Sequence, residues 1–285
     1  MNFDTPAKVK EICKKYGFRP QRARGQNFLI DKNIIAKIIE RAALAPQDSI
    51  LEIGPGLGVL TAALAGAAKK VLAVEQDKKL FQILSDEFNL PNVKFINSDI
   101  LKISNQKIAE LLGSKEYEIV SNLPFQITSS IFEKFLANEP RPKHLIFMIQ
   151  REVAERVIAA SPRMNLLALF VQFHARAQIL FRVGKNSFWP IPKVDSAVIE
   201  LVPKSSDVLD RALGRADINN FWHLVKMGYR SKRKYLFNNL VRYANISKSD
   251  LALIFGQLGM DPKIRAQNLD LQNWLDLAKK IQQKG

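Results

Sequence analysis

A short run of residues near the middle of the chain could orient an exocyclic amine for chemistry. The run is Ser121-Asn122-Leu123-Pro124-Phe125, and it follows an apolar segment that predicts a strand. The side-chain oxygen of Asn122 and the backbone carbonyl of Leu123 could accept both hydrogens of an amino group. Pro124 would stiffen the turn, and Phe125 could stack on a flipped base. On spacing alone, however, an ordinary strand-end turn with a buried Phe explains the run better.

The chemistry that suits these acceptors is attack by the amino group of adenine. That nitrogen is a poor nucleophile because its lone pair is delocalised into the ring, so a protein must localise the lone pair and aim it at an electrophile. A charged methyl donor supplies most of the driving force, and the share of the protein is alignment. The run therefore predicts a site that needs neither a metal nor a strong base.

A glycine-rich turn earlier in the chain predicts a cofactor site. Glu52-Ile53-Gly54-Pro55-Gly56-Leu57-Gly58 ends a predicted strand and begins a predicted helix. The glycines let backbone N–H groups approach a ligand closely. A dinucleotide-binding loop has its third glycine three residues after the second, but Val59 occupies that position here. The loop, with Gly54 and Gly56, therefore fits a cofactor without a pyrophosphate, such as S-adenosylmethionine.

Two acidic residues follow the next two predicted strands. Glu75 comes 21 residues after Gly54 and can accept hydrogen bonds from both hydroxyl groups of a ribose. Asp99 lies where a carboxylate could accept the amino group of the cofactor's adenine, although a solvated turn aspartate is nearly as good an interpretation. Gly54 and Glu75 together are a stronger signal than either alone, and they make the catalytic interpretation of Asn122 the better one.

The elements that must position these residues alternate between strand and helix. Apolar runs predict strands at 49–53, 70–74, 93–96, 118–121, 144–149, 178–183 and 197–202. Helical patterns separate all of these strands except the last two. We therefore expect an α/β fold with a Rossmann-like sheet that is mostly parallel and has an antiparallel edge strand. From Pro203 onward the pattern is entirely helical, which predicts a smaller C-terminal helical domain.

The charge of the chain indicates a polyanionic partner. The 285 residues have a net charge of +16. Residues 1–30 contain seven basic and two acidic residues, and residues 203–285 contain fifteen and seven. Clustered Lys and Arg favour nucleic-acid binding because they displace counterions from phosphates. We expect a basic N-terminal arm over 1–30, a methyltransferase domain over 31–202 and an RNA-binding helical domain over 203–285; a merely basic, soluble surface is the alternative.

The densest group of cations lies in the helical tail. Apolar residues interleave with it, so the pattern predicts a basic helix that packs and binds RNA phosphates at once. A basic helix face that is only solvated is the competing interpretation. The five cations fall within nine residues that contain no acid, and they are Lys226, Arg230, Lys232, Arg233 and Lys234.

Composition argues against several other kinds of protein. No stretch is apolar enough to span a membrane, and the N-terminus has no export signal. The single cysteine, Cys13, can form neither an internal disulfide nor a metal site, and the three histidines are scattered. We therefore expect a cytoplasmic monomer without a metal.

Four motifs occur in a specific order along the chain. They are Gly25-Gln26-Asn27-Phe28-Leu29-Ile30-Asp31, the glycine loop, Asn122-Leu123-Pro124-Phe125, and the segment 188–198, FWPIPKVDSAV. In order and separation they resemble the ribosomal RNA adenine dimethyltransferase family, above all its bacterial small-subunit (16S) members. The resemblance covers the chain from about Arg19 nearly to the C-terminus. It implies transfer of methyl groups from S-adenosylmethionine to N6 of two adjacent adenosines near the 3′ end of 16S rRNA, within a small ribosomal subunit or its precursor.

The resemblance also implies roles for individual residues. The cofactor would lie against Asn27, Leu29, Gly54, Gly56, Glu75, Asp99 and Asn122. Phe125 and Phe188 would hold the target adenine between them. The chain departs from the family pattern in two places: Phe125 replaces the usual tyrosine, and the segment 161–167 is short and lacks the usual Tyr-Gly pair.

Two other functions remain open on the sequence. One is methylation of a single adenine in 23S rRNA, for which the pocket and the basic helices would look much the same. The other is a non-catalytic nucleic-acid-binding assembly or transcription factor built on the same fold. An intact Asn122 pocket favours an enzyme over the second alternative.

Overall fold

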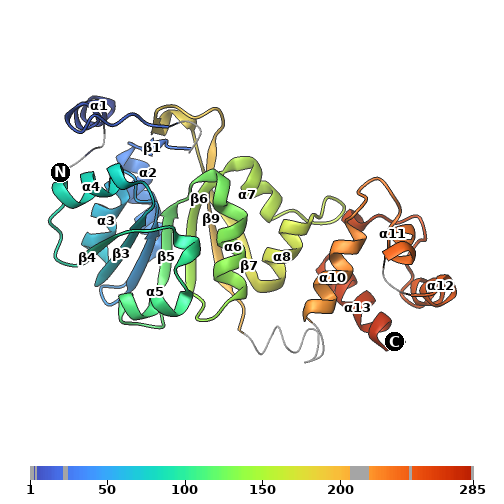
Figure 1. Cartoon of the computed structure of the whole chain (residues 1–285). Coiled ribbons are helices and arrows are strands. Elements are labelled where there is room, and N and C mark those ends of the chain that lie inside the picture. Colours follow the sequence, from blue (N-terminus) through green and yellow to red (C-terminus); the bar gives the residue numbers. More distant parts are fainter. Residues whose placement is uncertain (1–2, 4, 22–24, 206–217, 244–245, 284–285) are drawn as a thin grey trace. The chain divides into compact units, whose positions relative to one another are not determined.

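The chain forms two compact units. The computed structural model describes residues 3, 5–21, 25–205, 218–243 and 246–283 (Figure 1). The first unit comprises Met1–Ala154 and Ala177–Pro203, and the second comprises Glu155–Arg176 and Lys204–Gly285. The sequence predicted a single domain boundary after residue 202. The division by compactness differs from it, because residues 155–176 also belong to the second, helical unit.

A mixed sheet forms the centre of the first unit. Within the described ranges it has seven strands in the order β4-β3-β2-β5-β6-β9-β7. The strands are β2 (Ser49–Ile53), β3 (Lys70–Glu75), β4 (Val93–Asn97), β5 (Glu118–Asn122), β6 (His144–Gln150), β7 (Ala175–Val183) and β9 (Ser196–Pro203). Neighbours from β4 to β6 are parallel, whereas β9 runs antiparallel to β6. The predicted Rossmann-like sheet with antiparallel pairing near its edge is confirmed.

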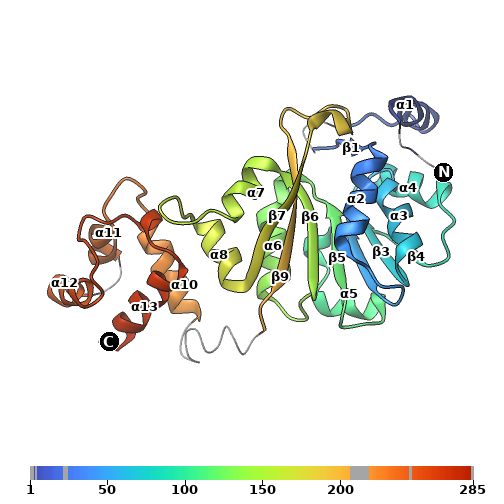
Figure 2. The ribbon, with the colours of Figure 1, turned by 180° about the vertical axis from the view of Figure 1, so that it is seen from behind.

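Helices cover both faces of this sheet (Figures 1 and 2). On one face, α2 (Lys32–Ala42) and α3 (Val59–Ala67) pack on an apolar cluster that includes Ile146 and Met148 of β6. Phe147 points to the opposite face, where its ring lies 5.9 Å from that of Phe132 on α6 (Thr128–Ala137). Successive β6 residues point to opposite faces of the sheet, and helices cover both faces. The strand is therefore a continuous apolar run. The unit also contains α4 (Lys78–Glu87) and α5 (Asn105–Leu112), and the division at Ala154 falls within α7 (Arg151–Val157).

The N-terminal arm is more structured than its charge alone suggests. Thr5 caps α1 (Pro6–Lys15), whose buried residues pack in a cluster with Leu80 and Ile83 of α4. Farther along the arm, β1 (Phe28–Leu29) pairs antiparallel with β8 (Phe188–Trp189). This pairing joins two of the four sequence motifs, although Phe28 and Phe188 are 160 positions apart in the sequence.

The second unit is helical, as predicted. Within the described ranges its helices include α8 (Leu166–His174), α10 (Ile218–Gly228), α11 (Leu236–Tyr243), α12 (Lys248–Gln257) and α13 (Leu271–Gln282). Leu169 and Phe173 of α8 belong to the same buried cluster as Phe221 of α10 and Trp274 of α13, which explains why 155–176 groups with this unit. No helix in the described ranges is long and apolar enough to cross a membrane.

Candidate active site

A cavity of about 770 Å³ lies at the carboxyl ends of the parallel strands of the first unit. Its volume is in the range of small-molecule and cofactor sites, and its place is where open α/β sheets bind ligands. All the residues predicted for the cofactor, for catalysis and for stacking line it. They are Asn27, Leu29, Gly54, Gly56, Glu75, Asp99, Asn122, Leu123, Pro124, Phe125 and Phe188.

The glycine loop between β2 and α3 needs glycine for two reasons. Gly54, Gly56 and Gly58 have φ values of +66°, +60° and +76°, which side-chain-bearing residues rarely adopt. A Cβ atom on Gly56 would lie 3.1 Å from the ring of Phe28, and one on Gly58 would lie 2.7 Å from the ring of Phe88. The loop therefore keeps its backbone close to the cavity while the arm residue Phe28 packs over it.

Glu75 ends β3 with its carboxylate fixed by the backbone. One oxygen accepts the Gly56 N–H at 3.2 Å, and the other accepts the Asp77 N–H at 2.8 Å. The residue is buried, and burial raises its pKa to about 7. Each carboxylate oxygen retains a further lone pair, so the group can also accept ligand hydroxyls.

Glu52 is a second buried carboxyl group of the cavity, and the sequence reasoning did not single it out. It is 2% exposed, and its Oε2 atom has no hydrogen-bond partner among the described residues. Burial, to which the charge of Glu75 adds, raises its pKa to about 8. A usable signal existed in the sequence, because an acidic residue inside an otherwise apolar strand is unusual.

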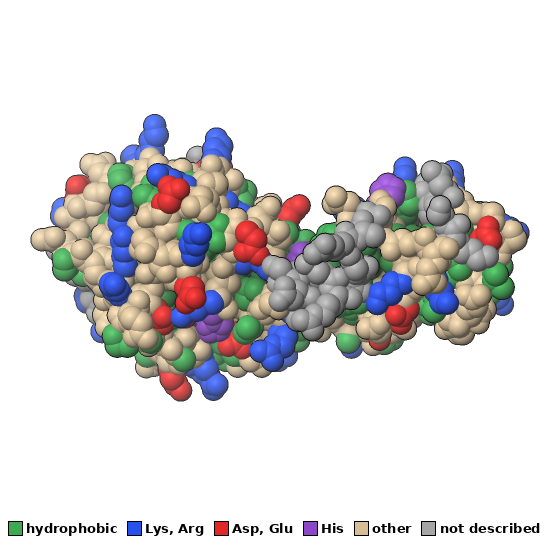
Figure 3. All heavy atoms as spheres, turned by 90° about the horizontal axis from the view of Figure 1, so that it is seen from below, with side chains coloured by type: hydrophobic (Ala, Val, Ile, Leu, Met, Phe, Trp, Pro, Cys, Tyr) green, Lys and Arg blue, Asp and Glu red, His purple; other side chains and the backbone are tan. Residues whose placement is uncertain are grey.

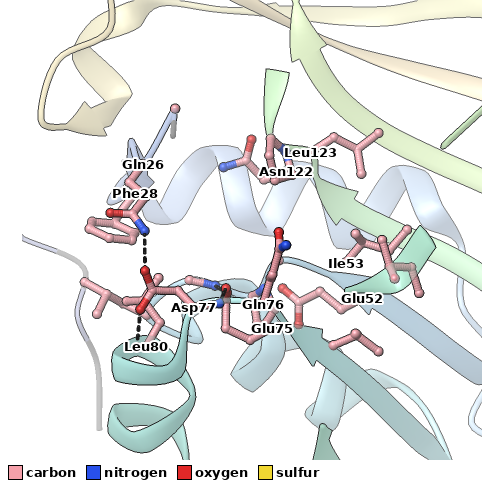
Figure 4. A pocket seen from close by; sticks show the side chains of 18 of the residues that line it. Gln26, Phe28, Glu52, Ile53, Glu75, Gln76, Asp77, Leu80, Asn122 and Leu123 are labelled. Carbon is pink, nitrogen blue, oxygen red and sulfur yellow. Dashed lines mark hydrogen bonds between the residues drawn. The ribbon is translucent and has the colours of Figure 1, made fainter. Parts of the chain in front are cut away.

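Asn122 stands at the end of β5, and Figure 4 shows its side chain projecting into the space above Glu75 and Gln76. The turn after it is held to the sheet, because the Leu123 N–H donates to the Met148 carbonyl at 3.0 Å. The Ser121 hydroxyl donates to the Ile53 carbonyl at 2.5 Å, which ties β5 to the end of β2. The amide of Asn122 is therefore presented from a fixed strand end.

The aromatic residues differ in how much surface they offer. Phe125 is partly buried and begins a short 3-10 turn, Phe125–Ile127. Phe188 is only 2% exposed and belongs to the apolar cluster under α2, although it also lines the cavity. Of the two rings, Phe125 thus has more surface available to a base.

Asp99 has a structural partner as well as a place in the cavity. Its carboxylate accepts the Leu101 N–H at 3.0 Å and caps the short turn Ile100–Lys102. The structure thus shows Asp99 as a turn-capping residue, and its second oxygen leaves a cofactor contact as a prediction.

The N-terminal arm closes one side of the cavity through Gln26. Its side-chain N–H donates to Asp77 Oδ2 at 3.2 Å (Figure 4). Its side-chain oxygen accepts the Gln21 N–H at 2.7 Å. Asp77 caps α4 with its other oxygen, which accepts the Lys79 N–H at 2.9 Å. Gln26, Gln76 and Asp77 line the cavity, and sequence reasoning gave none of them a role.

The predicted basic helix is instead a helix end followed by a turn. Lys226 lies on α10, whereas Arg230, Lys232, Arg233 and Lys234 lie between α10 and α11. The prediction of one helix was wrong because α10 ends at Gly228, and the Asn239 amide then donates to the carbonyl groups of Gly228 at 2.7 Å and Ser231 at 3.2 Å. All five cations are exposed, and we call the segment 229–235 the basic turn.

Charge elsewhere on the surface is more mixed. On the face of the molecule drawn in Figure 3, acidic and basic side chains are interspersed. In the described part of the chain, no group of three or more His, Cys, Asp or Glu side chains could hold a metal ion.

Sequence comparison identifies relatives of the whole chain. The family described as "Ribosomal RNA adenine dimethylase" matches residues 17–283. A "Ribosomal RNA small subunit methyltransferase A" from Dehalococcoides mccartyi is 36% identical over 273 residues, covering 95% of this chain and 91% of that protein. The protein of the same description from Bacillus pumilus is 37% identical over 292 residues, covering 99% of each chain.

Solved structures agree with these sequence relatives. A dimethyladenosine transferase from Plasmodium falciparum superposes with a TM-score of 0.73 at 26% identity, covering 89% of this chain and 96% of that one. The 23S rRNA methyltransferase ErmE superposes with a TM-score of 0.66 at 25% identity, covering 90% of this chain and all of that one (100%). This chain belongs to the ribosomal RNA adenine dimethylase family and is a ribosomal RNA methyltransferase.

Proposed function

We propose that the protein transfers methyl groups from S-adenosylmethionine to N6 of two adjacent adenosines near the 3′ end of 16S rRNA. The products are dimethyladenosine and S-adenosylhomocysteine, and the substrate is a small ribosomal subunit or its precursor in the cytoplasm, on which the protein acts as a monomer. The observation that carries the proposal is the meeting of Asn122, Glu75 and the glycine loop in one cavity. Relatives described as small-subunit methyltransferases and a dimethyladenosine transferase support the choice of substrate.

The residues of the cavity fit S-adenosylmethionine. Glu75 is fixed by two backbone N–H groups and is an acceptor for ribose hydroxyls. Gly54 and Gly56 keep side chains out of the space beside the loop, where Asn27 and Leu29 would contact the methionine end. The Asp99 carboxylate would accept a hydrogen bond from the amino group of the cofactor's adenine. When bound, the cofactor supplies a methyl group activated by a positively charged sulfur.

The remaining residues orient the target base. In the first transfer the Asn122 side-chain oxygen and the Leu123 carbonyl accept the two amino hydrogens, which directs the nitrogen lone pair toward the methyl group. In the second transfer the methylated nitrogen has one hydrogen left for these acceptors. Phe125 stacks on the adenine ring, and Phe188 supports its other face after exposing more of its own ring. Once the methyl group is transferred, the surplus proton is lost to water, so alignment rather than proton abstraction accounts for the catalysis.

RNA affinity comes from the two basic ends of the chain. Arg230, Lys232, Arg233 and Lys234 of the basic turn, with Lys226, contact phosphates of the folded RNA. In functional terms we propose an arm over 1–30, a methyltransferase domain over 31–202 and an RNA-binding domain over 203–285. The short segment 161–167 belongs to the second compact unit, and within it the Met164 N–H donates to the Gln267 carbonyl at 3.1 Å.

The test is transfer of labelled methyl groups to undermethylated small subunits, with large subunits in parallel, followed by nucleoside analysis. We expect dimethyladenosine in small-subunit RNA alone. Asn122→Ala should lower the rate by roughly 100-fold or more, as removal of an aligned polar contact does in other active sites, while RNA binding stays nearly unchanged. Asn33→Ala is the matched control, because Asn33 is an exposed residue of α2 outside the cavity.

The other outcomes identify the alternatives. Label in the large subunit alone would favour methylation of a 23S adenine; the structural neighbour ErmE is described as a 23S rRNA methyltransferase. Cofactor binding without transfer to either subunit would indicate a non-catalytic assembly factor. Full activity in Asn122→Ala would contradict the role given to that side chain.

A further inference from the structure

The loop that follows β8 carries unusually exposed apolar side chains. Ile191 is 57% exposed, the largest value among the large apolar side chains of the described residues, and Val194 in the same loop is 39% exposed. Lys193, between them, is exposed as well. Single exposed apolar residues are common on protein surfaces, so the position and the rigidity of this pair decide whether they matter.

The base of the loop is firmly anchored. Asp195 accepts the Arg151 N–H through its carbonyl at 3.0 Å and contacts the Arg151 guanidinium through its carboxylate at 3.3 Å. The same carboxylate accepts the Lys185 N–H at 3.2 Å. Pro190 and Pro192 on either side of Ile191 have fixed φ angles, and Pro192 is buried. The exposed side chains are therefore held outward by a loop that has little freedom to fold them in.

The loop lies at the rim of the cavity. Phe188, three residues before Ile191, lines the cavity, and three residues of chain span at most roughly 10 Å. β8 is also paired with β1, whose residues Phe28 and Leu29 line the cavity too. In Figures 1 and 2 the loop extends beyond β1 at the end of the sheet where the parallel strands finish. An RNA that placed a base in the cavity would pass this loop.

We propose that Ile191, supported by Val194, fills the gap that the target adenosine leaves in the RNA stack, while Lys193 contacts a neighbouring phosphate. The inference rests on the proposed function, because a base inside a folded RNA must leave its stack to reach Asn122. Apolar side chains hold such openings in other nucleic-acid complexes by packing between base steps. Ile191 is thus a positioning residue, which stabilises the extruded base without touching the reacting atoms.

RNA fits this surface better than a protein partner does. A stable protein interface buries roughly 800 Å² on each side, far more than two side chains at a loop tip can offer. The cations Lys185 and Lys193 are both exposed in the same region, which suits a polyanion.

The experiment compares Ile191→Ala with a matched exposed residue. Leu253→Ala is the control, because Leu253 is 50% exposed on α12 of the second unit. Base extrusion is followed by the fluorescence of 2-aminopurine, which replaces the target adenine in an RNA that contains the segment to be methylated. Methyl transfer is followed on undermethylated small subunits, and S-adenosylhomocysteine binding and thermal unfolding report on the cavity and the fold.

We expect Ile191→Ala to lower both the fluorescence increase and the transfer rate by roughly tenfold, with unchanged S-adenosylhomocysteine affinity and unfolding temperature. Ile191→Leu should restore both, and Leu253→Ala should behave as the unsubstituted protein. Wild-type fluorescence and transfer in Ile191→Ala would overturn the inference and leave the proposed function standing. Absence of transfer to small subunits by the unsubstituted protein would overturn the proposed function, and this inference with it.

Discussion

At the scale of single residues, two buried carboxyl groups share the cavity but have different surroundings. Glu75 receives two backbone N–H groups, whereas Glu52 has one oxygen without a partner among the described residues. Burial raises the pKa of both, to about 7 for Glu75 and about 8 for Glu52. Near neutral pH, Glu75 is therefore divided between its two forms, while Glu52 is mostly protonated.

Cofactor affinity should depend on pH through Glu75. Only the ionised carboxylate can accept both ribose hydroxyls, and protonation below a pKa of about 7 removes an acceptor. Raising the pH from 6 to 8 should strengthen S-adenosylhomocysteine binding by up to roughly tenfold, measured by calorimetry. Glu75→Gln should bind weakly with a flat pH profile, and a flat profile in the unsubstituted protein would contradict the assignment.

Stability should depend on pH through Glu52. The folded pKa of about 8 lies above the ordinary value of 4.5, so the folded state retains a proton that the unfolded state has lost. The contribution of Glu52 to stability is therefore fully present below pH 4.5 and is lost as the pH rises toward 8, at up to about 1.4 kcal/mol per pH unit.

Glu52→Gln keeps the shape of the protonated acid and removes its titration. We expect this variant to be more stable than the unsubstituted protein at pH 8, by about 1–3 kcal/mol, and to show a shallower fall in unfolding free energy between pH 5 and 8. Urea unfolding at several pH values measures both. Identical slopes in the two proteins would mean that Glu52 is ionised in the folded state.

At the scale of elements, two helical glycines of the second unit make opposite predictions. A Cβ atom on Gly228 would lie 2.3 Å from the Trp274 ring, whereas one on Gly256 of α12 would meet nothing within 4 Å. Gly228→Ala should therefore destabilise the protein by about 1–3 kcal/mol, through overpacking where α10 approaches α13. Gly256→Ala should stabilise it by about 0.5–1 kcal/mol, through better helix propensity. Thermal unfolding of the two variants side by side checks the contrast, and equal effects would refute it.

The sheet could be predicted from sequence because its strands are continuous apolar runs separated by helical patterns. Strand 49–53 was predicted with its observed bounds, and the others differ by a few residues at their ends. The pairing of β1 with β8 could not be predicted, since two residues carry no periodicity and their partners lie far away in the sequence. The basic turn was mistaken for a helix because the Asn239 amide, which donates to the Gly228 and Ser231 carbonyls where α10 has ended, lies beyond the turn in the sequence.

The site was predictable to the extent that it depends on strand ends. Parallel strands bring their carboxyl ends to one edge, so Gly54, Glu75 and Asn122 had to converge. Gln26 was missed because its contact with Asp77 depends on how the arm packs, which spacing does not encode. The burial of Phe188 was also beyond the sequence, because it follows from the β1–β8 pairing and the cluster beneath it.

At the scale of the whole molecule, the net charge of +16 should appear in the salt dependence of RNA binding. Replacing Arg230, Lys232, Arg233 and Lys234 with Gln removes four exposed cations from the basic turn. If each contacts a phosphate, the slope of log affinity against log salt should become shallower by about 3, as filter binding at several salt concentrations can measure.

The control removes the same charge from another part of the surface. Lys94, Lys102, Lys107 and Lys115 are exposed residues of the first unit, and their replacement with Gln should change the slope by less than about 1. Equal changes in the two quadruple variants would show that net charge rather than the basic turn determines affinity. An unaltered slope in the basic-turn variant would place the RNA contacts elsewhere.

The position of β9 has a consequence for how the protein is made. β9 is the last strand among the described residues, yet it lies between β6 and the edge strand β7. During translation β7 leaves the ribosome with no neighbour to pair with, and it can join the sheet only after residue 203, about seven-tenths of the 285-residue chain, has emerged. β1 likewise waits for β8 before the arm can close the cavity. A nascent chain therefore lacks the part of the cavity wall that Phe188 forms until residue 188 of 285 has emerged.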